Sequence, residues 1–248
     1  EEIDAFVEQG IASRPIAGFE PATFSRDLVP AKRLKLATPK PGDFGMLQRG
    51  TGSYWTWIDK APAEIKLKLT AGLVYQNQGN AKARLFPAAE TLGQSVSEGE
   101  VPPDKQPHEI VLKTTFTGLH RIEIEDRRAG SKLELPAGIA QTFNATFDQT
   151  ADLNGRHNLY FYVPKGTSVV GGFAEGPGRL VDGVSRKVRE FEGKPGYFSV
   201  PVGAGEDGKL WKFEFTSGRR VLLTVPPQMA RSADELLLPK EVVEKDAR

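Results

Sequence analysis

The length, composition and charge of this chain exclude several classes of protein. Its 248 residues can form one large domain or two small ones, and a formal net charge of +1 is not the basic footprint of a dedicated nucleic-acid binder. The chain has no cysteine, which excludes a disulfide scaffold, a thiolate metal site and a cysteine nucleophile. No apolar run approaches the ~20 residues that a membrane helix needs.

Residues 1–45 differ from the rest of the chain. In "EEIDAFVEQGI" the residues Ile3, Phe6 and Val7 have helical spacing and acids occupy the first turn, which predicts one short helix. The segment that follows is punctuated by proline and predicts an extended lead-in. The sequence starts without a Met or a signal-like apolar segment, so we expect a processed protein or a fragment of a longer one.

From Phe44 onward the apolar residues alternate with polar ones, as they do in half-buried strands. "EIKLKLT" and "HRIEIED" place aliphatic side chains on one face and charged side chains on the other. "YFSVPV", "LWKFEF" and "RVLLTV" follow, each bounded by Gly, Pro or Asp. Short strands between turn signals favour an all-β fold of the β-sandwich or jelly-roll type, because the chain offers no long amphipathic helix to cross over a parallel sheet.

An internal repeat indicates two antiparallel sandwiches in tandem rather than one large one. "SYWTWIDKAPAEIKLKL" and "NLYFYVPKGTSVVGGFA" share one plan, an aromatic strand, a proline-containing turn and a second strand. After residue 230 the tail contains Ser232 with Glu235 three positions on, which predicts a capped helical turn. The predicted segments are the lead-in (1–45), two jelly-roll-like sandwiches (46–140 and 141–230) and the tail (231–248).

Two motifs resemble ligand-binding loops. "GAGEDG", Gly203 to Gly208, matches G-x-G-x-x-G but precedes the strand "KLWKFEF" instead of a helix, so we interpret it as a hairpin loop. "TADLNG" resembles the start of a calcium loop but lacks the carboxylates that such a loop needs at its first and twelfth positions. A different Ca²⁺ site, built from Asp148 and Asp152, stays open beside a plain Asx-type turn. No other cofactor is predicted.

The histidines give no metal signature. His108, His120 and His157 do not pair with one another at metal-ligand spacing, so we predict no metal site. His120 has the same strand parity as Ile122, which predicts a partly buried, hydrogen-bonded imidazole.

No catalytic residue is predicted. Glu123 and Glu125 are alternate residues on one strand, ~6.6 Å apart, which is close to the carboxylate separation of inverting glycosidases. They lie beside arginines on a single strand, however, whereas catalytic carboxylates flank a substrate from opposite sides. A solvated charged face is the better interpretation. The chain also lacks G-x-S-x-G, H-E-x-x-H and P-loop motifs.

Strand parity predicts where the aromatic residues of two strands lie. Trp211, Phe213 and Phe215 share one parity, which predicts that all three are in the core. In "SYWTWID" the parity is ambiguous because Trp55 and Trp57 oppose an equally apolar face. That pattern predicts a central strand that is covered on both sides.

Tyr160 and Tyr162 oppose the obvious core residues of "NLYFYV", and two interpretations stay open. The rings either pack under a loop or a neighbouring domain, or they form a stacking platform for a sugar ring. Covering ~100 Å² of one ring at ~25 cal/mol/Å² yields about 2.5 kcal/mol, whereas millimolar affinity needs ~4.1 kcal/mol. A platform therefore needs several rings and hydrogen bonds. The predicted ligand-binding residues are Tyr160, Tyr162, Tyr54 and Trp57.

Residues 50–230 resemble a family of accessory modules. "LYFYVPKGTSVVGGFA", "KPGYFSVPV" and "GKLWKFEF" followed by "TVPP" resemble the accessory β-sandwich modules of large secreted bacterial proteins, which accompany polysaccharide-active or cell-surface enzymes. The resemblance implies non-catalytic carbohydrate binding, an extracellular, periplasmic or cell-surface location, and a glycan or further domains of a longer chain as partners. The alternatives are a structural domain pair with buried aromatics and, third, a glycosidase or lyase.

Overall fold

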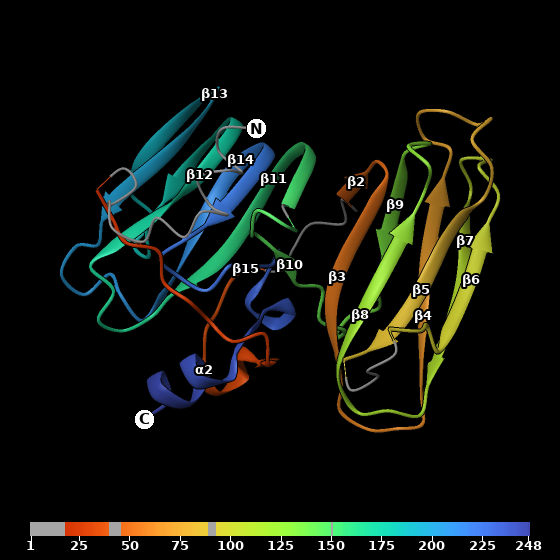
Figure 1. Ribbon diagram of the computed structural model, residues 1–248, viewed down its shortest axis with the longest axis horizontal. Helices are drawn as coiled ribbons and strands as arrows, with labels where there is room; N and C mark the ends of the chain where they lie inside the picture. The colour runs from red at the N-terminus through yellow and green to blue at the C-terminus, as the bar shows by residue number, and fades with distance from the viewer. Residues whose placement is uncertain (1–17, 40–45, 89–92, 150) are drawn as a thin grey trace.

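The computed structural model describes residues 18–39, 46–88, 93–149 and 151–248 (Figure 1). Nearly all of its elements are β-strands, and every pair of neighbouring strands is antiparallel. The all-β, sandwich-like architecture that the alternating pattern predicted is therefore confirmed. The helix predicted within residues 1–11 lies outside the described residues.

The first half of the molecule contains two sheets that face each other. Its strands are β2 (Met46–Gln48), β3 (Thr51–Ile58), β4 (Ala63–Ala71), β5 (Ala81–Pro87), β6 (Ser97–Val101), β7 (Pro107–Thr114), β8 (Gly118–Glu125) and β9 (Ser131–Glu134). One sheet has the order β3-β8-β5-β6, and the facing layer has the order β2-β9-β4-β7 (right-hand side of Figure 1). Alternate aliphatic residues of both layers, such as Leu67 and Ile122, are 0% exposed and fill the space between them.

The second half consists of one sheet of long strands and a separate, short two-stranded sheet. Its elements are β10 (Phe143–Asn144), β11 (Ala151–Val163), β12 (Val169–Val181), β13 (Lys187–Pro201), β14 (Lys209–Leu222) and β15 (Gln228–Met229). The order is β13-β12-β14-β11, and β10 pairs separately with β15. The core is aromatic: the ring of Phe213 lies 5.3 Å from Phe161 and 6.2 Å from Phe198.

The two halves share a single eight-stranded sheet. Strand β2 pairs with β9 of the first half and, through Leu47 opposite Asn154, with β11 of the second half. The backbone of Trp55 also exchanges two hydrogen bonds with Thr142, in the segment between the halves. The division into two sandwiches at residues 46–140 and 141–230, and jelly-roll connectivity, stay predictions.

Both ends of the described chain meet in what we call the terminal ribbon. It consists of β1 (Leu28–Pro30) paired with β16 (Leu237–Pro239), the 3-10 turns η1 (Ala31–Leu34) and η2 (Ala233–Glu235), and helix α2 (Lys240–Asp246). Its apolar side chains, among them Leu236, Leu238 and Val243, form a small core against the second half. Within the predicted lead-in, residues 18–39 contain the short strand β1 and the turn η1, and α2 was not predicted.

The predicted cap at Ser232 is wrong in its details. A 3-10 turn does begin after Ser232, but the serine side chain makes no capping hydrogen bond. The Ala233 N–H donates instead to the Thr38 hydroxyl at 2.9 Å, and the Glu235 carboxylate pairs with Arg231 at 2.7 Å. The Glu235 N–H bonds to the Ser232 backbone carbonyl at 3.3 Å instead of to the serine hydroxyl that a capping box would use.

Phe215 is exposed, which corrects its predicted place in the core. Trp211 and Phe213 are buried as expected, at 1% and 0% exposure, but Phe215 is 50% exposed. The pairing of β11 with β14 shifts register between Phe213 and Thr216, and Phe215 takes a left-handed φ of 49°. This bulge inserts one extra residue, so Thr216 takes the inward position and Phe215 faces outward. The guanidinium of Arg179 then lies 4.9 Å over its ring.

Candidate functional site

Tyr162 is part of the core that anchors the C-terminal helix. Its side chain is 1% exposed, and its hydroxyl donates a hydrogen bond to the Asp246 carboxylate of α2 at 2.9 Å. Burial, together with this hydrogen bond, raises the pKa of the Tyr162 hydroxyl. A ring that is covered in this way has no face for a sugar, so the structure favours the packing interpretation for Tyr162.

The other three predicted ligand-binding residues lie on two strands: Tyr160 shares a face of β11 with Tyr162, whereas Tyr54 and Trp57 occupy opposite faces of β3. Tyr54 is 4% exposed, donates to the Gln48 side-chain oxygen and meets Phe143 edge to face at 5.2 Å. Tyr160 is half-buried, and its backbone pairs with Ala230. Trp57 is half-buried on the outer face of β3. Ligand binding by these residues stays a prediction, and two of the four rings offer almost no surface to a ligand.

Strand β3 is covered on both faces, as its sequence predicted, but it is not a central strand. Tyr54, Thr56 and Ile58 point into the first-half core, while Trp55 and Trp57 pack against Leu28, Ala140 and Leu237 near the terminal ribbon. In its sheet β3 is the edge strand, next to β8. The outer face of β3 is therefore covered by the terminal ribbon and not by another strand of its own sheet.

A pocket of about 680 Å³ lies where the two halves and the terminal ribbon meet. We call it the junction pocket. Its walls come from residues 22–28, from β3 and β8, from residues 144–149 and from the end of β14 with residues 227–228. This volume is in the range of small-molecule binding sites. It therefore is the candidate site that the structure favours.

Aromatic side chains form one wall of the junction pocket. Phe24, Trp55 and Phe147 line it. Phe147 is held by the ring of Phe173 at 5.8 Å. The Trp55 indole N–H is buried and has no hydrogen-bond partner in the described part of the chain. An unpaired donor of this kind is costly, but the atom is closed off from solvent, so a ligand oxygen would reach it only after a shift of the side chains at the pocket wall.

Side-chain amides form a second wall. Asn144 donates to the Gln149 side-chain oxygen at 2.6 Å and accepts from Gln228 at 3.4 Å. Gln228 is 5% exposed, and its own side-chain oxygen lacks a partner among the residues described. Donors and acceptors thus alternate along this wall beside the aromatic one.

Charge at the junction pocket is balanced. Arg121 lines the pocket but stacks on the Phe86 ring at 4.2 Å and donates to Glu123 at 2.7 Å. Arg26 and Asp148 face each other at the rim, 3.7 Å apart and largely exposed. The described lining residues therefore offer no unbalanced charge to an ionic ligand, and a neutral polar ligand suits the pocket best.

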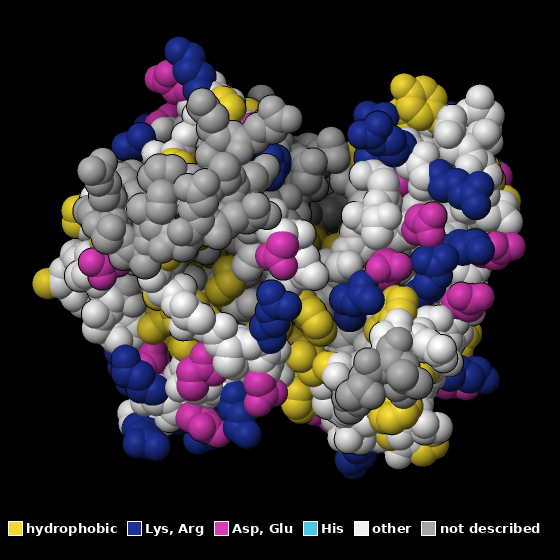
Figure 2. All heavy atoms as spheres, viewed as in Figure 1, with side chains coloured by type: hydrophobic (Ala, Val, Ile, Leu, Met, Phe, Trp, Pro, Cys, Tyr) yellow, Lys and Arg dark blue, Asp and Glu magenta, His cyan; other side chains and the backbone are white. Residues whose placement is uncertain are grey.

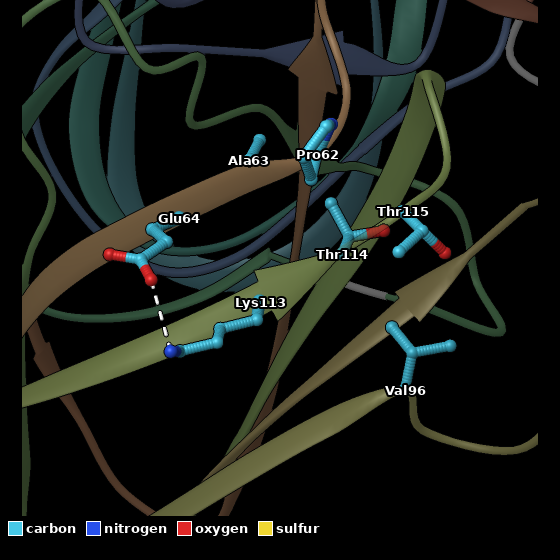
Figure 3. Close-up of a pocket in the computed structure, with 7 residues that line it drawn as sticks. All are labelled: Pro62, Ala63, Glu64, Val96, Lys113, Thr114 and Thr115. Atoms are coloured by element: carbon cyan, nitrogen blue, oxygen red, sulfur yellow. Dashed lines mark ion pairs between the residues drawn. The ribbon is translucent and has the colours of Figure 1, made fainter.

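A smaller hollow of about 410 Å³ lies between β4, β7 and the segment before β6 (Figure 3). Pro62, Ala63 and Val96 give it an apolar lining, and the pair of Glu64 with Lys113, at 3.0 Å, is its one ion pair among the described residues. No aromatic ring is among its described lining residues. It carries less recognition chemistry than the junction pocket.

The charged and histidine residues weighed from the sequence have structural roles. Glu123 and Glu125 both pair with Arg84, at 3.2 and 3.1 Å, which confirms the charged face. His120 is hydrogen-bonded to the Thr114 hydroxyl and the Gly118 carbonyl, as predicted, but it is fully and not partly buried, and burial lowers its pKa. "GAGEDG" is a loop between β13 and β14, as predicted, but it is not a hairpin loop, because β12 lies between these two strands in the sheet.

In the part of the chain that the structure describes, no group of three metal-ligating side chains comes together. The possible Ca²⁺ site at Asp148 and Asp152 stays a prediction, because the Asp152 side chain lies outside the described residues. The backbone around Asp152 belongs to strand β11. None of the helices described is long and apolar enough to cross a membrane.

Comparisons with protein-family models and with curated proteins find no match to this chain. Its function is therefore inferred from the fold and the junction pocket. This pocket was not predictable from the sequence, because strand parity is the only local signal at Trp55 and no local pattern connects Trp55 to Phe147 or Gln228.

Proposed function

We propose that this chain is a non-catalytic, carbohydrate-binding accessory module, and that the junction pocket holds one sugar unit of a glycan. The observation that supports this proposal is the pairing of an aromatic wall, which holds the unpaired Trp55 N–H, with an amide wall, which holds the unpaired Gln228 oxygen. A sugar ring presents apolar C–H faces to aromatic rings and hydroxyl groups to amides, so the two walls complement both of its surfaces.

The expected affinity is modest. Covering ~100 Å² on each of two rings contributes about 5 kcal/mol, and each net hydrogen bond adds about 1 kcal/mol before the cost of ordering the ligand is subtracted. Such a site reaches roughly millimolar affinity, which corresponds to ~4.1 kcal/mol. Weak binding is useful when the module is tethered to an enzyme or repeated in one chain, as in a secreted polysaccharide-active protein at the cell surface or outside it.

The test is a glycan-array screen followed by affinity electrophoresis, with each fold checked by circular dichroism. Trp55→Phe removes the unpaired indole N–H and keeps an apolar ring, so we expect about tenfold weaker binding. Trp57→Phe is the matched control, because Trp57 lies on the same face of β3 and its N–H already donates to Asp59 at 3.0 Å. Binding that is unaffected by Trp55→Phe but lost in Tyr160→Ala would overturn the junction pocket in favour of the predicted tyrosine.

The second candidate is a structural domain that spaces or stabilises a partner domain. The burial of Tyr162 and its hydrogen bond to Asp246 favour this candidate. Wild-type protein that binds no glycan in the screen would support it and contradict our proposal. A glycosidase or lyase is the third candidate, and release of reducing ends from a glycan that the protein binds would identify it.

A further inference from the structure

A group of exposed apolar residues lies at one end of the first half. Leu73, Val74 and Tyr75 follow one another in the loop between β4 and β5 and are 37%, 38% and 50% exposed. We call them the apolar tip. The loop lies at the upper right of Figure 1, and Figure 2 shows hydrophobic side chains beside Lys and Arg side chains there. Three adjacent exposed hydrophobic residues on a loop indicate an interaction surface.

The apolar tip is held in place by the neighbouring turn. The N–H groups of Leu73, Val74 and Tyr75 donate to the carbonyls of Gly130 and Ala129 at 2.8–3.0 Å. A Cβ atom at Gly130 would lie 2.6 Å from a Val74 methyl carbon, so this glycine allows the close contact. The backbone therefore presents these side chains to solvent in a fixed arrangement, which lowers the entropic cost of binding a partner.

Exposed cations surround the apolar tip. They are Arg49, Lys105, Arg127 and Arg128. The Arg49 guanidinium lies 5.7 Å over the Tyr75 ring, and none of the four forms an ion pair with a carboxylate in the described part of the chain.

The acidic residues nearby offset this charge only in part. The Asp104 carboxylate is 42% exposed and lies 2.9 Å from the His108 ring, so it is a surface anion next to Lys105. Asp126 is fully buried, where it accepts from Ser131 and two backbone N–H groups. Four exposed cations beside one exposed carboxylate leave the surface around the apolar tip positive.

Two of these arginines occupy backbone positions that rarely hold them. Arg127 and Arg128 have left-handed φ angles of 50° and 68° in a tight turn that the Ala129 N–H closes onto the Asp126 carbonyl at 2.8 Å. Turns with two left-handed residues favour Asn and Gly, which adopt this conformation with little strain. Strained residues of this kind concentrate at functional positions. The turn thus holds two charged side chains beside the apolar tip at a cost in backbone energy.

We propose that this end of the molecule binds the surface of an anionic lipid bilayer. The apolar tip enters the boundary between headgroups and acyl chains, and the surrounding arginines and lysine contact lipid phosphates and carboxylates. A bilayer is the preferred partner because the surface is a protruding loop with an apolar end and a positive rim, which is the charge pattern that an anionic membrane complements. This surface is separate from the junction pocket, and the two proposals stand or fall independently.

The test is co-sedimentation of the protein with vesicles of phosphatidylcholine alone or of phosphatidylcholine with phosphatidylserine. We expect binding only to the anionic vesicles, and little binding by Leu73→Ser/Tyr75→Ser. Arg127→Asn/Arg128→Asn keeps residues suited to the turn and removes two charges. It should weaken binding by about 25-fold, or about fivefold for each charge.

Matched control variants make the test specific. Lys60→Asn/Lys194→Asn removes the same charge from exposed sites elsewhere, and Val184→Ser removes a hydrophobic side chain that is 49% exposed in the second half. Both should bind like the wild type. The proposal would be overturned if Lys60→Asn/Lys194→Asn weakened vesicle binding as much as Arg127→Asn/Arg128→Asn does. It would also be overturned if the wild type did not bind anionic vesicles. Binding to polyglutamate that depends on Arg127 and Arg128 but not on the apolar tip would overturn it in favour of an acidic protein.

Discussion

Arg220 is the most unusual buried residue of the second half. Its side chain is 0% exposed, and no carboxylate among the described residues pairs with it. Its guanidinium donates instead to the carbonyls of residues 175, 176, 177 and 219 at 2.5–3.1 Å, and it lies over the rings of Phe191 and Phe213. Burial lowers the pKa of Arg220 to about 10. This side chain holds the irregular part of β12 against β14.

We predict that Arg220→Met is strongly destabilising. Methionine fills much of the volume but leaves several buried carbonyls without a donor, so we expect a loss of about 3 kcal/mol in the free energy of unfolding. Arg220→Lys should recover little of the lost free energy of unfolding, because a single ammonium group does not span the positions that the planar guanidinium reaches. Urea denaturation measures both effects.

Arg219→Met is the control for this prediction. Arg219 is the next residue, its side chain is 43% exposed, and its contact with Glu175 is a 3.8 Å surface ion pair. Surface pairs of this kind contribute little, so the free energy of unfolding should change by no more than about 0.5 kcal/mol. Equal urea midpoints for Arg220→Met and Arg219→Met would contradict the role that we assign to Arg220.

At the scale of elements, the β12–β13 hairpin depends on one carboxylate in its turn. The Asp182 side chain is 1% exposed and accepts from the Val184 N–H at 3.1 Å and from the backbone and side chain of Arg186 at 2.8 Å. Burial alone would raise the pKa of Asp182, but these hydrogen bonds and the charge of Arg186 outweigh it and lower the pKa.

The lowered pKa of Asp182 predicts acid sensitivity of this hairpin. A carboxyl with a lower pKa in the folded state stabilises the protein above its unfolded pKa of about 3.9, and this stabilisation is lost as the pH falls through the folded pKa. Asp182→Asn should therefore lower the stability at pH 7 and flatten its decline below about pH 4. Urea midpoints between pH 7 and pH 2.5 measure this. Asp148→Asn, at an exposed ion pair, is the control, and an equally steep decline in Asp182→Asn would contradict the prediction.

Strands and helices of this chain differ in how well the sequence predicts them. The alternation in "EIKLKLT" is a local consequence of one buried face, so β4 and its inward residues were predictable. Helix α2 has only two adjacent apolar residues, Val242 and Val243, and seven residues are too few for a stable isolated helix. It forms where Asp246 meets Tyr162 and the Lys165 N–H, and these contacts are distant in the sequence.

The candidate site was less predictable than the fold. Parity correctly placed Tyr160 and Tyr162 opposite the core residues of β11, but parity does not indicate that α2 covers that face. The junction pocket is likewise a product of tertiary structure, because the lead-in, β3 and residues 144–149 contribute its walls. The bulge at Phe215 reversed the parity of β14 for the same reason: the register between strands is set by pairing and not by the residues of one strand.

At the scale of the whole molecule, the shared sheet joins the two halves through a short strand. Strand β2 pairs with β9 over three residues and with β11 at Leu47, so the ladder is continuous from β13 to β7. The Trp55–Thr142 backbone pair and the terminal ribbon add contacts between the halves. A continuous ladder makes the loss of one half costly for the other, which favours cooperative unfolding of the chain.

We predict one unfolding transition for the whole chain, and its three tryptophans allow a direct test. Trp55→Phe/Trp57→Phe leaves Trp211 as a reporter of the second half, whereas Trp211→Phe leaves reporters only in the first half. Each variant should show the same urea midpoint by its fluorescence and by circular dichroism. Leu47→Pro removes the β2 N–H at the junction and should separate the two transitions, because proline interrupts a central strand. Separate transitions without Leu47→Pro would contradict the prediction and support two independently folding sandwiches.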